Sequence, residues 1–306
     1  HQYTLNAYAY LGLSRMAGIL AVVDINEGER LQTEASAWKH DIRTSFFEAM
    51  ALSPVVPLGN GHWVPTSPPW TEASGPRALY LEKEKFYSHG TFTVSDAMLG
   101  PMYLIFCEVL SPDEQAARFL HDYHSELFYQ RNSAFSQPYY SRHDYVQAKR
   151  GMIKPYLDMY YTTMSGLADR ETYTFWEHYY KVSVHKTHEE AWFLMQTRWM
   201  LYLEDNDTLR LFSAAPRKWF NPGSEIRLDR VSSYFGPLDF SVQPVAGSIT
   251  ATLTCKPERA PRVVQFRLPH PQGKKPVTIK GGLWNPENET VIVTNFTGEA
   301  QITLEY

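Results

Sequence analysis

The chain has little cysteine, no long apolar run and no excess of one charge. Its 306 residues include only Cys107 and Cys255, which excludes a disulfide framework and a cysteine-rich metal site. No apolar stretch approaches the roughly 20 residues that a membrane-spanning helix needs. The 29 basic and 33 acidic residues give a formal charge of −4 and form no basic stripe. Nucleic acid is therefore not an expected partner.

Several chemistries lack their sequence signatures. The chain has no glycine-rich phosphate loop and no motif for a Ser, Cys or Lys nucleophile. His185 and His188 lie near two glutamates, but they are not the two histidines one helical turn apart that bind zinc in metalloproteases. We therefore expect neither a metal nor a cofactor. His1 is followed by no charged-then-apolar leader, so we interpret the start as processed or truncated.

Aromatic residues are abundant by contrast, at 14% of the chain, with 20 Tyr and 8 Trp. Flat rings with polar tips suit dense cores and also the apolar faces of sugar rings. Core packing explains most of them, and we assign about one in four to a binding surface.

The first two thirds of the chain show helical periodicity. Apolar residues from Leu5 to Val23 and from Ala35 to Met50 predict two helices joined near Asn26-Glu27-Gly28, an antiparallel hairpin. A second hairpin is predicted to join helices over 99–110 and 116–127, the latter opened by a capping box from Ser111 to Glu114. A long helix through Met152 and Met164, stopping near Gly166, and one beginning at Thr187 complete the set. Irregular stretches at 53–95, 130–143 and 167–186 separate these elements.

Beyond Asn206 the period becomes alternating, with Gly and Pro between short runs, which predicts an antiparallel β-sandwich over residues 206–306. Residues 1–205 contain the helical hairpins of an (α/α) toroid. A complete ring of six hairpins needs about twelve helices, so this region supplies about half. We favour an N-terminal remainder that precedes His1 in a longer chain over an incomplete or oligomer-completed ring.

The segment 170–180 is the most function-like, because carboxylates stand among aromatic rings. Partial desolvation favours the neutral form of a carboxyl group and can bring it into the acid-base range. The alternative interpretation is an ion pair between Glu171 or Glu177 and either Arg170 or a lysine. Around these residues we expect a carbohydrate site. Its predicted substrate contacts are His62, Trp63, Trp70, Arg77, Tyr140, Trp176, His178 and His188.

Thr174-Phe175-Trp176-Glu177, followed by a helix and then strands, resembles the Thr-x-Trp-Glu element of the α-L-rhamnosidase-like branch of six-hairpin glycosidases. The resemblance covers the whole chain in architecture and a short stretch in motif. It implies inverting hydrolysis of a poly- or oligosaccharide, with Glu177 as general base. The family's upstream Asp-x-Pro-x-Arg element has no counterpart here. Glu72 and Asp96 are the candidates for the second catalytic carboxyl, beside a residue before His1.

Three alternatives remain open at this point. A polysaccharide lyase on the same toroid would use Tyr and His to abstract a proton from a uronic acid. A non-catalytic carbohydrate-binding module would bind a glycan without releasing product. A structural protein would use its aromatic loops as a subunit interface. The expected location is periplasmic or extracellular.

Overall fold

The computed structural model describes residues 2–67, 102–126, 138–179 and 181–306. Internal contacts divide the chain into two units. One comprises residues 1–146 and 162–190, and the other comprises residues 147–161 and 191–306.

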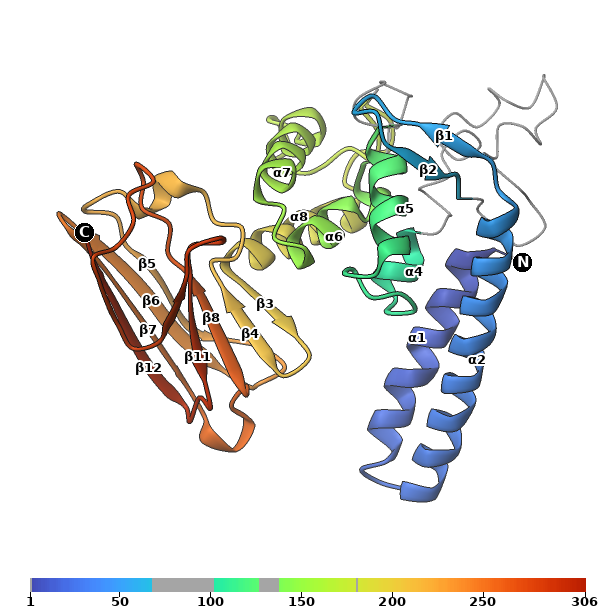
Figure 1. Cartoon of the computed structure of the whole chain (residues 1–306), viewed down its shortest axis with the longest axis horizontal. Helices are drawn as coiled ribbons and strands as arrows, with labels where there is room; N and C mark the ends of the chain where they lie inside the picture. The colour runs from blue at the N-terminus through green and yellow to red at the C-terminus, as the bar shows by residue number, and fades with distance from the viewer. Residues whose placement is uncertain (1, 68–101, 127–137, 180) are drawn as a thin grey trace. The chain divides into compact units, whose positions relative to one another are not determined.

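The first unit begins with a long helical hairpin (Figure 1), formed by α1 (Tyr3–Leu20) and α2 (Ile25–Leu52). The connection was predicted at residues 26–28, which is wrong, because those residues lie in the first turn of α2. Asp24 is the N-cap, and its carboxylate accepts the backbone N–H of Glu27 at 3.1 Å. Gly28 allows close packing instead, since a Cβ there would lie 2.6 Å from the backbone of Ala21.

The second predicted hairpin is shorter than expected. Helix α4 spans Met102–Phe106 and α5 spans Gln115–Ser125. Helix α4 ends early because Glu108 takes a left-handed backbone conformation, with φ 64°. The predicted capping box is half formed. Ser111 N–H donates to the Glu114 carboxylate at 2.7 Å, while the Ser111 hydroxyl accepts from Asp113 N–H.

The Glu114 carboxylate makes its half of the box and is also held by Arg43, which donates to both of its oxygens at 3.0 and 2.9 Å. Between the two hairpins lies a two-stranded ribbon of β1 (Val55–Pro57) and β2 (Trp63–Pro65). One apolar core joins α1, α2, α4 and α5, and its fully buried side chains include Tyr3, Phe46, Met102, Leu104 and Leu120.

The predicted long helix is two helices, α6 (His143–Lys149) and α7 (Ile153–Leu167), preceded by the 3-10 turn η3 (Pro138–Ser141). The break falls at Gly151, whose φ of 67° ends the first helix. Helix α8 spans Thr187–Leu201, as the capping signal at Thr187 predicts. It pairs with α7 where the Tyr156 hydroxyl donates to the Gln196 carbonyl and the ring of Tyr160 stacks on Phe193.

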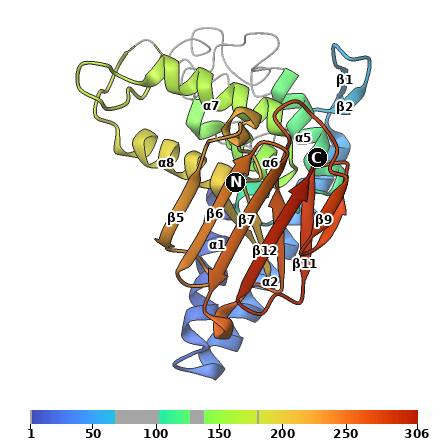
Figure 2. The same ribbon diagram turned by 90° about the vertical axis from the view of Figure 1, so that its left-hand side faces the viewer.

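Two five-stranded sheets form most of the second unit, and Figure 2 shows the second sheet with its strands side by side. The order in the first sheet is β10-β11-β8-β4-β3, and in the second it is β5-β6-β7-β12-β9. The strands are β3 (Tyr202–Asp205), β4 (Thr208–Leu211), β5 (Ile226–Val231), β6 (Leu238–Val245), β7 (Ser248–Cys255), β8 (Val263–Arg267), β9 (Thr278–Lys280), β10 (Leu283–Asn285), β11 (Thr290–Thr294) and β12 (Glu299–Glu305).

The inward faces of both sheets share one apolar core, which includes Leu211, Phe266, Phe240, Leu253 and Ile302. Alternating burial along β6 and β7 produces it, as expected for a β-sandwich. The prediction of a purely antiparallel sandwich is wrong in one place, because β4 and β8 pair in parallel. The first strand of the sandwich, β3, begins at Tyr202, within the stretch predicted to be helical.

Within the second unit, a network of charges joins Lys149, the last residue of α6, to the first sheet. Lys149 Nζ lies 3.0 Å from Asp205 Oδ1 and also donates to the Glu204 carbonyl. Arg210 donates to Asp205 and to the Lys149 carbonyl. The described chain is therefore a helical part followed by a β-sandwich. The closed toroid stays a prediction.

Candidate functional site

The Thr174–Glu177 motif follows a compact loop built on Asp169. Asp169 Oδ1 accepts the backbone N–H groups of Glu171 and Thr172, each at 2.9 Å. Its other oxygen accepts the indole N–H of Trp176 at 2.9 Å. These hydrogen bonds hold the pKa of Asp169 below its usual range. The loop thus fixes the ring that precedes Glu177.

The backbone on either side of Glu177 is unusual. Tyr173, Lys181, Ser183 and His185 all have φ between 56° and 59°, although none is glycine. Left-handed conformations are uncommon for such residues and persist only where the surroundings enforce them. One enforcing contact is the hydrogen bond from Glu177 N–H to the Ser183 carbonyl at 3.1 Å.

The Glu177 side chain is 14% exposed and lies in an ion pair with Lys186. Lys186 Nζ approaches Glu177 Oε2 to 3.1 Å, and the Nε2 atom of His178 lies 3.8 Å from the same oxygen. The hydrogen bond to Glu177 raises the pKa of Lys186 above its ordinary value. The ammonium therefore stays charged at neutral pH. This is the ion pair that the alternative interpretation of the segment predicts.

A second pair of side chains comes from η3 and α8. The rings of Tyr140 and His188 stack with centroids 4.3 Å apart and an interplanar angle of 22°. His188 Nδ1 lies 3.2 Å from Oε1 of Glu189, whose side chain is only 1% exposed. Glu189 thereby orients the imidazole that Tyr140 covers.

The Glu177–Lys186 pair and the Tyr140–His188 pair influence each other electrostatically. Burial raises the pKa of the Tyr140 phenol, and the carboxylates of Glu189 and Glu177 raise it further. Burial also lowers the pKa of His178, although the same two carboxylates oppose that shift. At neutral pH the phenol is therefore protonated and His178 is neutral. Tyr140 is a hydrogen-bond donor in this state.

The structure brings together Glu177, His178, Tyr140 and His188 from the predicted site, and holds Trp176 beside them. His62 and Trp63 belong to a different surface, the tip of the β1–β2 ribbon. Four predicted residues lie outside the described residues, namely Trp70, Glu72, Arg77 and Asp96.

Sequence reasoning missed the contributions of Lys186 and Glu189. Both lie in the segment from His185 to Glu190, which was interpreted as capping chemistry for α8. The available signal was the position of Glu189 three residues before Trp192 on the same predicted helix, which places it near the apolar face that the structure buries. Only the fold shows that Lys186 turns back toward Glu177.

Three buried histidines also gather in the first unit. His121, His124 and His143 are at most 3% exposed, and the His143 ring centroid lies 5.5 Å and 6.1 Å from those of His121 and His124. Burial lowers the pKa of His124 to about 3 and that of His143 well below its usual range. Within the described ranges, no group of three or more His, Cys, Asp or Glu side chains is arranged to hold a metal ion.

A comparison with models of known protein families and with curated proteins finds no match for this chain. The resemblance to six-hairpin glycosidases thus rests on the Thr174–Glu177 motif and the order of helices and strands. Among residues 2–67, 102–126, 138–179 and 181–306, no helix has the length and apolar character to span a membrane.

Proposed function

We propose that the chain is a glycoside hydrolase that acts on a poly- or oligosaccharide with inversion, and that Glu177 is its general base. The observation that carries the proposal is the environment of Glu177. Its carboxylate is largely buried and held at 3.1 Å by Lys186, beside His178 and the stacked pair of Tyr140 and His188. A general base needs a fixed position and a controlled charge.

In the proposed reaction, Glu177 accepts a proton from water while the water oxygen attacks the anomeric carbon. The bond between that carbon and the leaving oxygen breaks, and a second carboxyl group protonates the leaving oxygen. The anomeric configuration inverts because water attacks the face opposite to the leaving group. The protonated Tyr140 phenol and neutral His178 are suited to hydrogen bonds with sugar hydroxyls.

The second carboxyl group remains a prediction: Glu72 and Asp96 are its candidates within the chain, both outside the described residues, and a residue before His1 is the other candidate. Among the described residues, Glu189 is the other carboxylate of the candidate site and must be considered for this role. Its side chain is almost fully buried and hydrogen-bonded to His188, so its function is to orient that imidazole. Inverting enzymes separate their two carboxyl groups by about 6.5–9.5 Å to admit the water.

The protonation of Tyr140 favours hydrolysis over the lyase alternative. A lyase needs a group that removes a proton from the carbon beside a uronate carboxylate. Because the pKa of Tyr140 is raised, its phenolate is a minor species at neutral pH and a poor choice for that base. Lyase activity would be recognised by the ultraviolet absorbance of the new double bond.

The test compares Glu177→Gln with Glu171→Gln, an exposed glutamate of the same loop. With a panel of oligosaccharides and aryl glycosides, we expect Glu177→Gln to lower kcat by about 10²–10⁴-fold, the range for general-base catalysis. Glu171→Gln should release sugar at the wild-type rate. NMR of the first product formed should show the inverted anomer. Equal turnover by wild type and Glu177→Gln would rule out the assignment.

A further inference from the structure

A surface depression of about 570 Å³ lies between the β1–β2 ribbon and helix α5. Its volume falls within the roughly 300–1,000 Å³ typical of small-molecule sites. Val64 of the ribbon is buried, and Phe119 packs on the small apolar cluster formed by Leu58, Val64 and Tyr123. The remaining lining residues are His62, Trp63, Asp113, Gln115, Arg118 and Asp122.

The depression uses a different face of α5 from the buried histidines. Gln115, Arg118, Phe119 and Asp122 recur at the spacing of one helical face. His121 and His124 leave the helix on another face, where they contact His143. None of the residues around Glu177 lines the depression.

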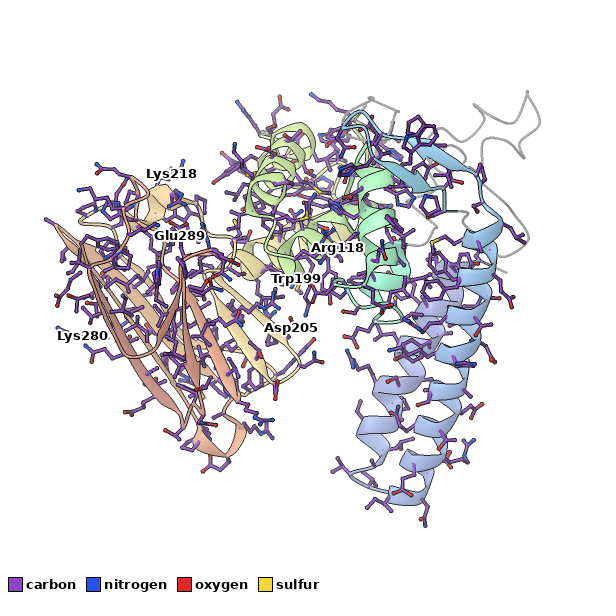
Figure 3. The ribbon with its side chains drawn as sticks, viewed as in Figure 1. Arg118, Trp199, Asp205, Lys218, Lys280 and Glu289 are labelled. Atoms are coloured by element: carbon purple, nitrogen blue, oxygen red, sulfur yellow. The ribbon has the colours of Figure 1, made fainter. Side chains whose placement is uncertain are left out.

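Trp63 gives the depression an exposed aromatic wall. Its side chain is 64% exposed, whereas a tryptophan usually buries most of its surface. Polar groups with complementary donors and acceptors surround it, with the guanidinium of Arg118 on α5 (Figure 3) and the carboxylates of Asp113 and Asp122. A flat ring beside paired hydrogen-bonding groups fits a pyranose, which has one apolar face and an equatorial rim of hydroxyls.

The charges of the lining specify the class of sugar. Two aspartates and one arginine leave a net negative charge when His62 is neutral. A uronic acid would therefore bring a carboxylate toward like charges, which costs binding free energy. Neutral pyranoses incur no such cost and offer vicinal hydroxyls to both the aspartates and Arg118.

We infer that this depression is an accessory saccharide-binding subsite in which a neutral pyranose stacks on Trp63 and hydrogen-bonds to Asp113, Arg118 and Asp122. The inference rests on the proposed carbohydrate function but assigns a second, non-catalytic surface. It would hold a polymeric substrate on the enzyme between cleavage events.

The indole N–H resonance of Trp63 provides a direct test, assigned by its loss in Trp63→Tyr. The probes are cellohexaose, xylohexaose, mannohexaose and hexagalacturonic acid, each titrated into the wild-type chain and into Glu177→Gln. We expect a saturable shift with at least one neutral hexasaccharide and none with hexagalacturonic acid. Arg118→Ala should weaken the affinity measured at this resonance by about tenfold. The indole of Trp284 in the sandwich serves as the internal control.

Each outcome decides the inference. A Trp63 resonance that no neutral hexasaccharide shifts, or that only hexagalacturonic acid shifts, would overturn it. Unchanged affinity in Arg118→Ala would remove that residue from the subsite and contradict the stated geometry. Full turnover by Glu177→Gln with an intact Trp63 shift would reject the hydrolase and keep the subsite. Loss of turnover in Glu177→Gln together with no Trp63 shift would keep the hydrolase and reject the subsite.

Discussion

Gly166, in the last turn of α7, lies directly against the ring of Tyr179. A Cβ built at Gly166 would fall 2.5 Å from Cε1 of that ring, well inside van der Waals contact. The sequence suggested that Gly166 stops the helix, but α7 continues to Leu167. The glycine is required because any side chain at this position would collide with Tyr179. Tyr179 belongs to the same loop as Glu177, so this packing also helps to position that loop.

Replacing Gly166 with alanine should therefore lower the free energy of unfolding by about 1–3 kcal/mol, the usual cost of forced overpacking. The measurement is urea denaturation followed by circular dichroism. Gly12→Ala in α1 is the matched control, because no atom lies within 4 Å of a Cβ there. That variant should be neutral or gain up to about 1 kcal/mol from helix propensity. A Gly166→Ala variant as stable as wild type would contradict the packing.

Stability should fall as the pH is lowered, because of the buried histidines. The folded-state pKa of His124 is about 3, whereas the unfolded value is about 6.5. Between these values the unfolded chain binds a proton that the folded chain does not. The stability is therefore fully present above about pH 6.5 and is lost progressively as the pH falls toward 3, by a few kcal/mol.

Thermal unfolding at a series of pH values would measure this dependence. His124→Gln should flatten the curve between pH 6.5 and 3, whatever its effect on stability at pH 7. His40→Gln removes an exposed histidine from α2 and should leave the curve unchanged. Identical slopes for wild type and His124→Gln would show that another group causes the acid sensitivity.

Removing the Lys186 ammonium should impair activity more than folding. Lys186→Met removes the ammonium that lies 3.1 Å from the largely buried Glu177 carboxylate. Lys186 is 35% exposed, so solvent screening limits the expected loss of stability to about 1 kcal/mol. We expect kcat to fall by about tenfold or more, since the position of Glu177 depends on this contact. Lys154→Met on the exposed side of α7 is the matched control, and equal kcat values for the two variants would contradict the role of Lys186.

Glu289 is an acidic residue of the sandwich whose replacement should lower stability. It receives two hydrogen bonds from Arg217 and lies 3.9 Å from Arg267, whose side chain is 7% exposed. Burial lowers the pKa of Arg267 to about 10, and Glu289 opposes this shift. Glu289→Gln should cost about 2–4 kcal/mol, because it leaves a buried cation uncompensated. Glu305→Gln, which breaks the exposed pair with Lys280, should cost much less, because solvent screens that pair.

Local signals in the sequence were sufficient for most elements but not for their ends. The apolar period identified α1 and α2, yet their connection was misplaced, because Gly28 was interpreted as a turn residue when it serves close packing against Ala21. The box at Ser111 is half formed because the Ser111 hydroxyl accepts from Asp113 N–H and not from Glu114 N–H. Its Glu114 is shared with Arg43, a partner 71 residues away that no local pattern indicates.

The candidate site shows the same limit. Glu177 and its aromatic neighbours were predicted because their residue types are unusual in sequence. Lys186 was missed because its role depends on the three left-handed residues between Glu177 and α8, namely Lys181, Ser183 and His185. Glu189 was missed because its role depends on its burial beside His188. The parallel pairing of β4 with β8 was missed for a related reason, since alternation reports which face is buried and not which strand lies alongside.

That parallel pair also constrains how the sandwich folds. After β4 the chain leaves the first sheet, builds β5, β6 and β7 of the second, and only then returns with β8 to register Leu209 against Val264. The β4–β8 ladder of one sheet therefore closes a long loop that contains three strands of the other sheet. Such non-local pairing makes folding slow. A chain truncated after β7 would leave the edge of β4 unpaired and open to association with other chains.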